Sequence, residues 1–113
     1  MTQEEVSELS INELHRLAAM VVREASVFTP TDEWYLNGVM DGDFHPTMKN
    51  THAMIVASAL DMNICFGDRV VLVSEPAGGH SRTVSYEGKT IPARINAMRR
   101  AITLLAADYA QYI

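Results

Sequence analysis

The sequence predicts an α+β fold, an α/β/α sandwich with a small antiparallel sheet covered by helices on both faces. Two strand-like runs flank Gly67-Asp68 and predict a hairpin over residues 63–74. Segments with apolar residues at three- and four-residue spacing, 11–25 and 91–109, predict helices. Because side chains alternate along a strand, Ile64 and Val71 face one side of this hairpin while Cys65 and Leu72 face the other. Both faces are apolar, so the sheet is expected to need a helical layer above and below it.

Length and composition predict a single domain over residues 1–113. The chain is 48% hydrophobic and 20% charged, ordinary values for a globular protein. The longest apolar runs fall far short of the ~20 residues of a membrane span, and the acidic N-terminus does not resemble a signal peptide. Cys65 is the single cysteine, so it cannot form an intrachain disulfide. These features predict a cytoplasmic protein without a membrane association.

The net charge of −5 is unevenly distributed along the chain. Residues 1–46 carry nine acidic and two basic residues, whereas residues 47–113 carry five acidic and seven basic residues. An acidic first half repels phosphate backbones, which disfavours broad nucleic-acid binding but leaves room for a local basic surface.

The first helix is predicted from a capping box. Ser10 and Glu13 have the required spacing. An apolar stripe follows, formed by Leu14, Leu17, Ala18, Val21 and Ala25. Such stripes usually pack in the core of their own domain, and a partner-binding face is the alternative.

The middle of the chain alternates turn signals with short elements. Asn37-Gly38 favours a type I′ turn, so a small hairpin is expected over residues 33–40. Residues 47–60 have a helical pattern, and Gly67-Asp68 suits a type II′ turn with glycine at the positive-φ position. Residues 75–81 are loop-like in composition, and 83–86 are expected to form a further strand.

The last helix has the strongest signals. Thr90 suits the N-cap and Pro92 the first turn. Its predicted buried stripe consists of Ile91, Ile95, Met98, Ile102, Leu105 and Tyr109.

The order of these elements resembles a known group of small proteins. The capped helix start at residues 9–13, the segment Phe44-His45-Pro46-Thr47 before a short helix and the hairpin 63–74, and the terminal stretch 91–99 together resemble the NinX-like, or phage ABA-sandwich, proteins. The resemblance covers most of the chain and implies an α/β/α sandwich encoded by a phage or prophage. It implies no established reaction and therefore no catalytic residues.

Residues that could carry chemistry form no assembled catalytic or cofactor-binding motif. Asp41, Asp43, His45 and His52 could converge on a divalent ion, but Asp-Gly-Asp is also a common turn. Residues 78–82 could present backbone N–H groups to an anion, yet they lack phosphate-loop spacing. His80 and Ser81 are adjacent without a positioned acid, and Cys65 is expected to be buried and inert. We therefore predict no cofactor and favour a non-enzymatic protein, with a small hydrolase or metal-dependent enzyme around Asp41–His52 as a third hypothesis.

Two binding surfaces are predicted. A protein-binding surface, for an unidentified partner or for self-association, is formed by Trp34, Tyr35, Asp41, Asp43 and His45. A nucleic-acid-binding surface is the alternative, formed by Arg82, Lys89, Arg94, Arg99 and Arg100. The sequence therefore predicts a non-enzymatic phage or prophage accessory protein that acts through protein contacts, with a nucleic-acid-associated factor as the second hypothesis.

Overall fold

The computed structural model describes residues 1–25 and 44–112. Their helices are α1 (Gln3–Ser7), α2 (Ile11–Ala25), α4 (Asn50–Ala59), α5 (Ile91–Tyr109) and the short 3₁₀ helix η1 (Ala110–Tyr112). Their strands are β1 (Asn63–Phe66), β2 (Val70–Ser74) and β3 (Ser81–Ser85). The predicted α+β class with a small antiparallel sheet is confirmed. No helix in this part of the chain is long and apolar enough to cross a membrane.

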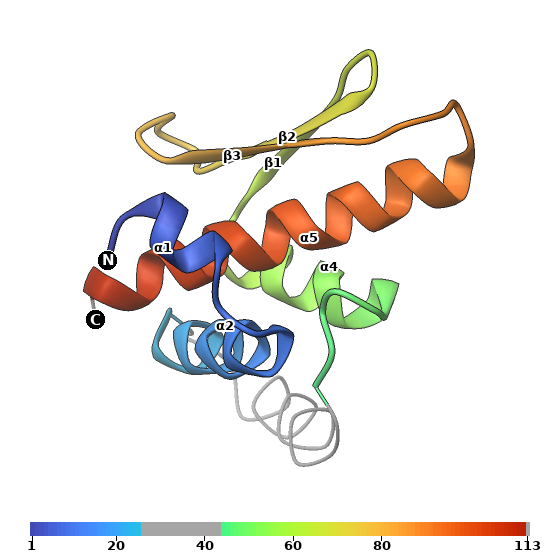
Figure 1. Cartoon of the computed structure of the whole chain (residues 1–113). Helices are drawn as coiled ribbons and strands as arrows, with labels where there is room; N and C mark the ends of the chain where they lie inside the picture. Colours follow the sequence, from blue (N-terminus) through green and yellow to red (C-terminus); the bar gives the residue numbers. More distant parts are fainter. Residues whose placement is uncertain (26–43, 113) are drawn as a thin grey trace.

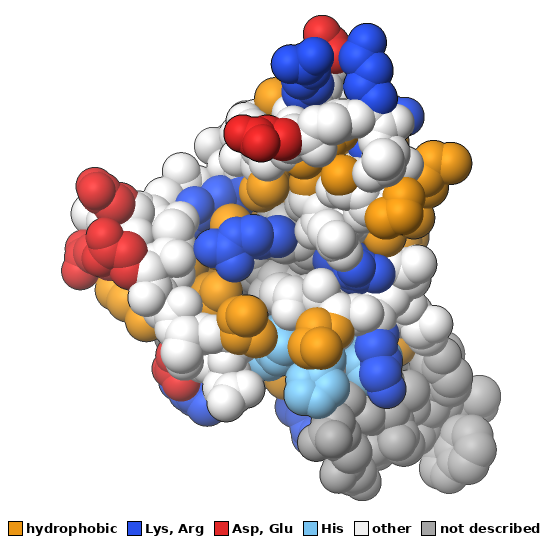
Figure 2. Space-filling model, turned by 45° about the vertical axis from the view of Figure 1, so that its right-hand side comes forward, with side chains coloured by type: hydrophobic (Ala, Val, Ile, Leu, Met, Phe, Trp, Pro, Cys, Tyr) orange, Lys and Arg blue, Asp and Glu red, His pale blue; other side chains and the backbone are white. Residues whose placement is uncertain are grey.

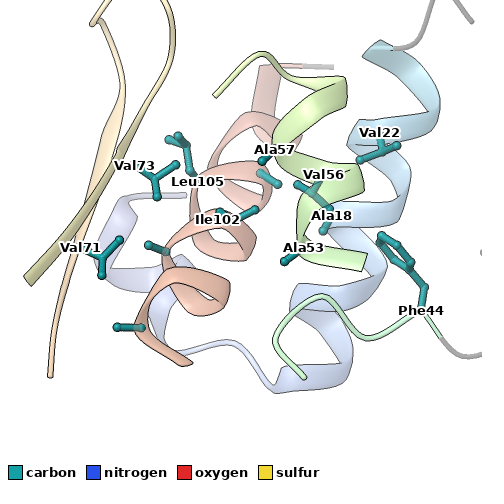
Figure 3. Close-up of a cluster of buried hydrophobic side chains, with 13 residues drawn as sticks. Ala18, Val22, Phe44, Ala53, Val56, Ala57, Val71, Val73, Ile102 and Leu105 are labelled. Carbon is teal, nitrogen blue, oxygen red and sulfur yellow. The ribbon is translucent and has the colours of Figure 1, made fainter. Parts of the chain in front are cut away.

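Helix α5 lies in the middle of the described structure. The sheet packs on one side of it, and α2 and α4 pack on the other (Figure 1). Figure 3 shows Val71 and Val73 of β2 pointing toward Ile102 and Leu105 of α5. Across α5, the core continues through Ala18 and Val22 of α2, Ala53, Val56 and Ala57 of α4, and Phe44.

The sequence of α5 explains how one helix can contact two layers. Thr90 caps it by accepting a hydrogen bond from the Ala93 backbone N–H at 3.3 Å. Farther along, consecutive residues from Ala101 to Asp108 are all buried. Three of these eight residues are alanines, which let neighbouring elements approach closely. The helix was predicted correctly, but its buried surface is wider than the single predicted stripe, and Ile91 is exposed.

Within residues 1–25 and 44–112, the helices pack on one face of the sheet. Its order is β1-β2-β3, and the register pairs Cys65 with Leu72 and Leu72 with Thr83. These three side chains lie on the face opposite Val71 and Val73; Cys65 and Thr83 are exposed and Leu72 is 38% exposed. In the described part of the chain the helices therefore lie on one face of the sheet rather than on both, and the predicted burial of Cys65 is wrong. The outer face of three short strands exposes little apolar area. Packing against α5 is enough to bury the inner face.

The hairpin turn lies one residue later than predicted. Phe66 pairs with Val71, and the Gly67 N–H donates to the Val70 carbonyl at 2.9 Å. The central turn residues are therefore Asp68 and Arg69, and the positive φ of 59° falls on Arg69 rather than on the glycine. Glycine is favoured at 67 because a larger residue would be too close to Val70: its Cβ would lie 2.9 Å from Val70 Cγ2.

Helices α1 and α2 begin at side-chain caps. Ser10 Oγ accepts from the Glu13 N–H at 3.2 Å, which confirms the predicted start of α2. Helix α1 was not predicted, although Thr2 and Glu5 form a capping box of the same kind. Met1 and Gln111 are hydrogen-bonded at 3.0 Å, and the two termini lie side by side (Figure 1).

Candidate functional site

A pocket lies at the end of the molecule that holds the termini. It encloses about 640 Å³, within the range of small-ligand sites. The ends of α2 and α5, η1, the C-cap of α4 and the β2–β3 loop meet there (Figure 1). Its lining residues are Val21, Glu24, Ala25, Leu60, Glu75, His80, Tyr109 and Tyr112, and we call it the acidic aromatic pocket.

Glu75 is the centre of the pocket's polar network. Its Oε2 accepts a hydrogen bond from the Tyr109 hydroxyl at 3.2 Å, and its Oε1 lies 3.3 Å from His80 Nδ1. The His80 ring also packs edge-on against Tyr109, with centroids 6.0 Å apart, and lies 5.4 Å from the ring of Tyr112. A carboxylate and three rings are thus held in one place by mutual contacts.

The β2–β3 loop positions Glu75 and His80 through its backbone. The Glu75 N–H donates to the His80 carbonyl at 3.0 Å, and the Gly78 N–H donates to the Glu75 carbonyl at 2.9 Å. Gly78 has a φ of 74°, which suits glycine. A Cβ on Gly79 would lie 2.2 Å from Glu75 Oε1, so a side chain at 79 would displace the carboxylate. The predicted loop at 75–81 is therefore a support for the pocket.

The electrostatics of the pocket favour an ionised glutamate beside a protonated phenol. Burial works against ionisation of Glu75, but the hydrogen bonds from His80 and Tyr109 outweigh it and lower the pKa of the carboxyl group. Burial, reinforced by the neighbouring Glu75 charge, raises the pKa of Tyr109 to about 12. At neutral pH the pocket therefore presents the Glu75 carboxylate next to aromatic rings, and the exposed Glu24 is also part of its lining.

The pocket has the parts of a binding site rather than of a nucleophilic catalyst. The hydroxyl of Tyr109 donates to Glu75, and its raised pKa makes it a poor nucleophile at neutral pH. Ser81, which follows His80 in sequence, is not among the residues that line the pocket. Carboxylates and ring faces together suit a cation with an apolar stem.

The predicted protein-binding surface falls mostly outside the described residues. Trp34, Tyr35, Asp41 and Asp43 belong to the part of the chain that is not described, as does the predicted hairpin at 33–40. His45 is described, and it lies in a cluster with His52, the residue considered beside it as a possible metal ligand, and with His15, which the sequence did not single out.

The three histidines form a packed cluster between α2, α4 and the segment before α4. His15 Nε2 lies 2.6 Å from Thr47 Oγ1, and His45 Nδ1 lies 3.3 Å from His15 Nδ1. His52 Nδ1 accepts from the His45 backbone N–H at 2.9 Å, and its ring stacks on Phe44. His15 and His52 are 5% and 8% exposed, and burial is the main cause that lowers the pKa of each. Within residues 1–25 and 44–112, no group of three or more His, Cys, Asp or Glu side chains is placed to hold a metal ion.

The residues of the predicted nucleic-acid-binding surface lie in separate places. Arg82 is 8% exposed and is engaged with Asp108, so it is not available to a phosphate backbone. Arg99 bonds the Thr47 carbonyl at 3.1 Å beside α4, and Arg100 approaches the Ser7 carbonyl at 3.5 Å beside α1. Lys89 and Arg94 line a small pocket at the opposite end of α5 from the acidic aromatic pocket.

Sequence reasoning missed the acidic aromatic pocket because its residues are far apart in the chain. Glu75 and His80 were assigned to a loop, and Tyr109 to the stripe of the last helix. The usable signal was the adjacent Gly78-Gly79 pair, which permits a tight loop that returns to its own starting residue. Comparison with protein-family models, curated proteins and solved structures finds no match. Membership of the NinX-like family therefore stays a prediction.

Proposed function

We propose that this protein is a non-enzymatic accessory protein that binds a lysine or arginine side chain of a partner protein in the acidic aromatic pocket. The observation that carries the proposal is the combination of the Glu24 and Glu75 carboxylates with the rings of Tyr109 and Tyr112 in one pocket. The proposal keeps the predicted mode of action, protein contact, and moves it to a surface with described geometry.

The chemistry of the pocket selects a long cationic side chain. Val21 and Leu60 offer apolar contact to a methylene stem, and the tyrosine rings offer π faces to a cation. The charge-assisted hydrogen bond from an ammonium or guanidinium group to Glu75 is about twice as strong as a neutral one. Glu75 uses one oxygen for Tyr109 and the other for His80, which leaves lone pairs on both for the ligand.

Peptide titration followed by NMR tests the proposal. A short lysine peptide is expected to shift the signals of the pocket residues saturably, and the same peptide with acetyl-lysine, which has no charge, is expected to bind much more weakly. Glu75→Gln keeps the size and the acceptor for Tyr109 but removes the charge, so it is expected to weaken lysine-peptide binding about tenfold.

The matched control is Glu4→Gln, which changes the net charge by the same amount at an exposed position of α1. The proposal would be contradicted if Glu4→Gln and Glu75→Gln lost the same amount of lysine-peptide affinity. Equal affinity of the wild-type protein for the lysine and acetyl-lysine peptides would contradict it as well. If the protein forms a dimer that Glu75→Gln dissociates, the occupant is a second copy instead.

The phage or prophage origin and the surface that includes Trp34 and Tyr35 stay predictions. Genomic neighbourhood tests the origin. Replacement of both aromatic residues tests the surface: folding, oligomeric state and captured partners that all remain unchanged would remove the case for it. Salt-dependent binding of an oligonucleotide, lost with Arg99 and Arg100, tests the nucleic-acid alternative.

A further inference from the structure

A second, basic pocket lies at the other end of α5. It encloses about 240 Å³, and its described lining residues are Gly67, Asp68, Arg69, Tyr86, Gly88, Lys89 and Arg94. Figure 2 shows Lys and Arg side chains gathered at the top of the molecule, the end at which the β1–β2 turn lies in Figure 1. The pocket combines Lys89 and Arg94 of the predicted nucleic-acid-binding surface with Arg69, which the sequence did not single out.

Two turns and a helix start build the basic pocket. The Arg69 carbonyl accepts from the Tyr86 N–H at 2.9 Å, which joins the β1–β2 turn to the end of β3. Gly88, with a φ of 81°, then reverses the chain so that Lys89 lies just before the N-cap of α5. Arg94 is on the second turn of α5. Backbone geometry therefore brings together three cationic side chains that are up to 25 residues apart.

Arg94 has an unused hydrogen-bond donor. Its guanidinium lies over the Phe66 ring, with Cζ 5.0 Å from the ring centroid. Its Nε is buried and has no hydrogen-bond partner among the described residues. The ring covers one face of the guanidinium plane, whereas Nε–H points outward within that plane, so the contact with the ring gives it no acceptor. A buried donor without a partner destabilises the protein, so a small movement of the Arg94 side chain that brings Nε to an oxyanion would be favourable.

The charges identify the ligand class. Arg69, Lys89 and Arg94 outweigh Asp68, so the pocket is formally +2 in a chain that is −5 overall. The first turn of α5 has no acidic residue, and the positive end of the helix dipole adds to the attraction for an anion. We propose that the basic pocket binds the dianionic phosphate group of a phosphate monoester.

A compact dianion fits these observations better than a polyanion. The pocket is small, and the basic residues that would extend it along a nucleic-acid backbone lie elsewhere: Arg82 is buried, Arg99 is beside α4 and Arg100 is beside α1. The acidic remainder of the chain repels a long phosphate backbone but acts weakly on one small ion held by direct contacts.

Titration with inorganic phosphate and with phenyl phosphate, followed by amide NMR at constant ionic strength, tests the proposal. Both are expected to shift the amides of 67–69 and 88–89 saturably, whereas chloride is not. Binding is expected to strengthen as the pH rises through the second phosphate pKa, near 6, because the dianion then predominates. Arg94→Gln is expected to weaken binding about tenfold or more.

Arg16→Gln is the control, because Arg16 pairs with Glu13 on α2 and lies outside the pocket. Lys89→Gln, at an exposed position, is the second variant if Arg94→Gln does not fold, and it is also expected to weaken binding. The proposal is overturned by the absence of saturable shifts at these amides or by equal binding to Arg94→Gln, Lys89→Gln and wild type. It is equally overturned if an oligonucleotide without a terminal phosphate produces the same shifts with greater affinity.

Discussion

The buried pair of Arg82 and Asp108 should be the most sensitive polar contact in the fold. Arg82 Nε and Nη2 donate to the two Asp108 carboxylate oxygens, each at 2.6 Å, and Asp108 is 1% exposed. The same guanidinium donates to Ser7 Oγ and to the Gln3 carbonyl, both at 2.7 Å. One side chain of β3 therefore holds α1 and α5 together.

Arg82→Met removes these four hydrogen bonds and leaves a buried carboxylate with Gln3 Nε2 as a donor at 3.1 Å. Removal of one partner of a buried ion pair typically destabilises a protein by about 3–5 kcal/mol. The free energy of unfolding of a domain is about 5–15 kcal/mol, so Arg82→Met should lose a large part of it. Urea unfolding followed by circular dichroism measures the loss.

The double variant Arg82→Met/Asp108→Leu should recover about 2 kcal/mol or more relative to Arg82→Met, because no uncompensated charge then remains. Arg82→Lys keeps the charge but not the two-pronged geometry, and should fall between wild type and Arg82→Met. A loss below about 1 kcal/mol for Arg82→Met would refute the reasoning, as would a double variant whose loss equals the sum of the single losses. If Arg82→Met does not fold, Arg82→Lys and Asp108→Asn provide the measurement.

Three further outcomes are expected. Burial lowers the pKa of His15 and His52 from 6.5, so the unfolded chain binds more protons near that pH. The free energy of unfolding should therefore fall as the pH decreases from 7.5 to 5.5, less steeply in His15→Gln, as urea titrations at these two pH values would show. Arg69→Gly should raise the thermal midpoint through a gain of up to about 1 kcal/mol, because Arg69 has a positive φ, and an unchanged or lower midpoint would contradict this. Exposed Cys65 should react with a thiol reagent in the native protein, at a rate that does not depend on unfolding.

The sequence predicted the elements well because each element carries local signals. Ser10 and Thr90 cap the helices as their spacing indicates, and the strands begin and end near the predicted residues. The turn was misplaced by one residue because the glycine was taken to mark the positive φ. Gly67 instead avoids a close contact between a Cβ and Val70, and the positive φ falls on Arg69. A glycine signal alone does not distinguish these two reasons.

The layer order could not be predicted from the hairpin. Cys65 and Leu72 make the outer face look apolar in sequence, yet their area is small enough to remain exposed. The better signal was in α5, where Ala97, Ala101 and Ala106 accompany the larger residues on more than one side. A helix that is apolar or small on all sides tends to be buried on all sides. That pattern predicts the central position that α5 occupies in Figure 3.

The same central helix also links the two proposed binding pockets and predicts that they act independently. Tyr109 and Arg94 are about 22 Å apart along α5 at 1.5 Å per residue, which exceeds the screening length of about 8 Å at physiological ionic strength. The helix dipole favours cations at the Tyr109 end and anions at the Arg94 end, and each effect is confined to the terminal turn. Saturating phosphate should therefore change lysine-peptide affinity by less than about twofold, and Glu75→Gln should leave phosphate affinity unchanged. A fivefold or larger change in either titration would mean that α5 moves on binding and couples its two ends.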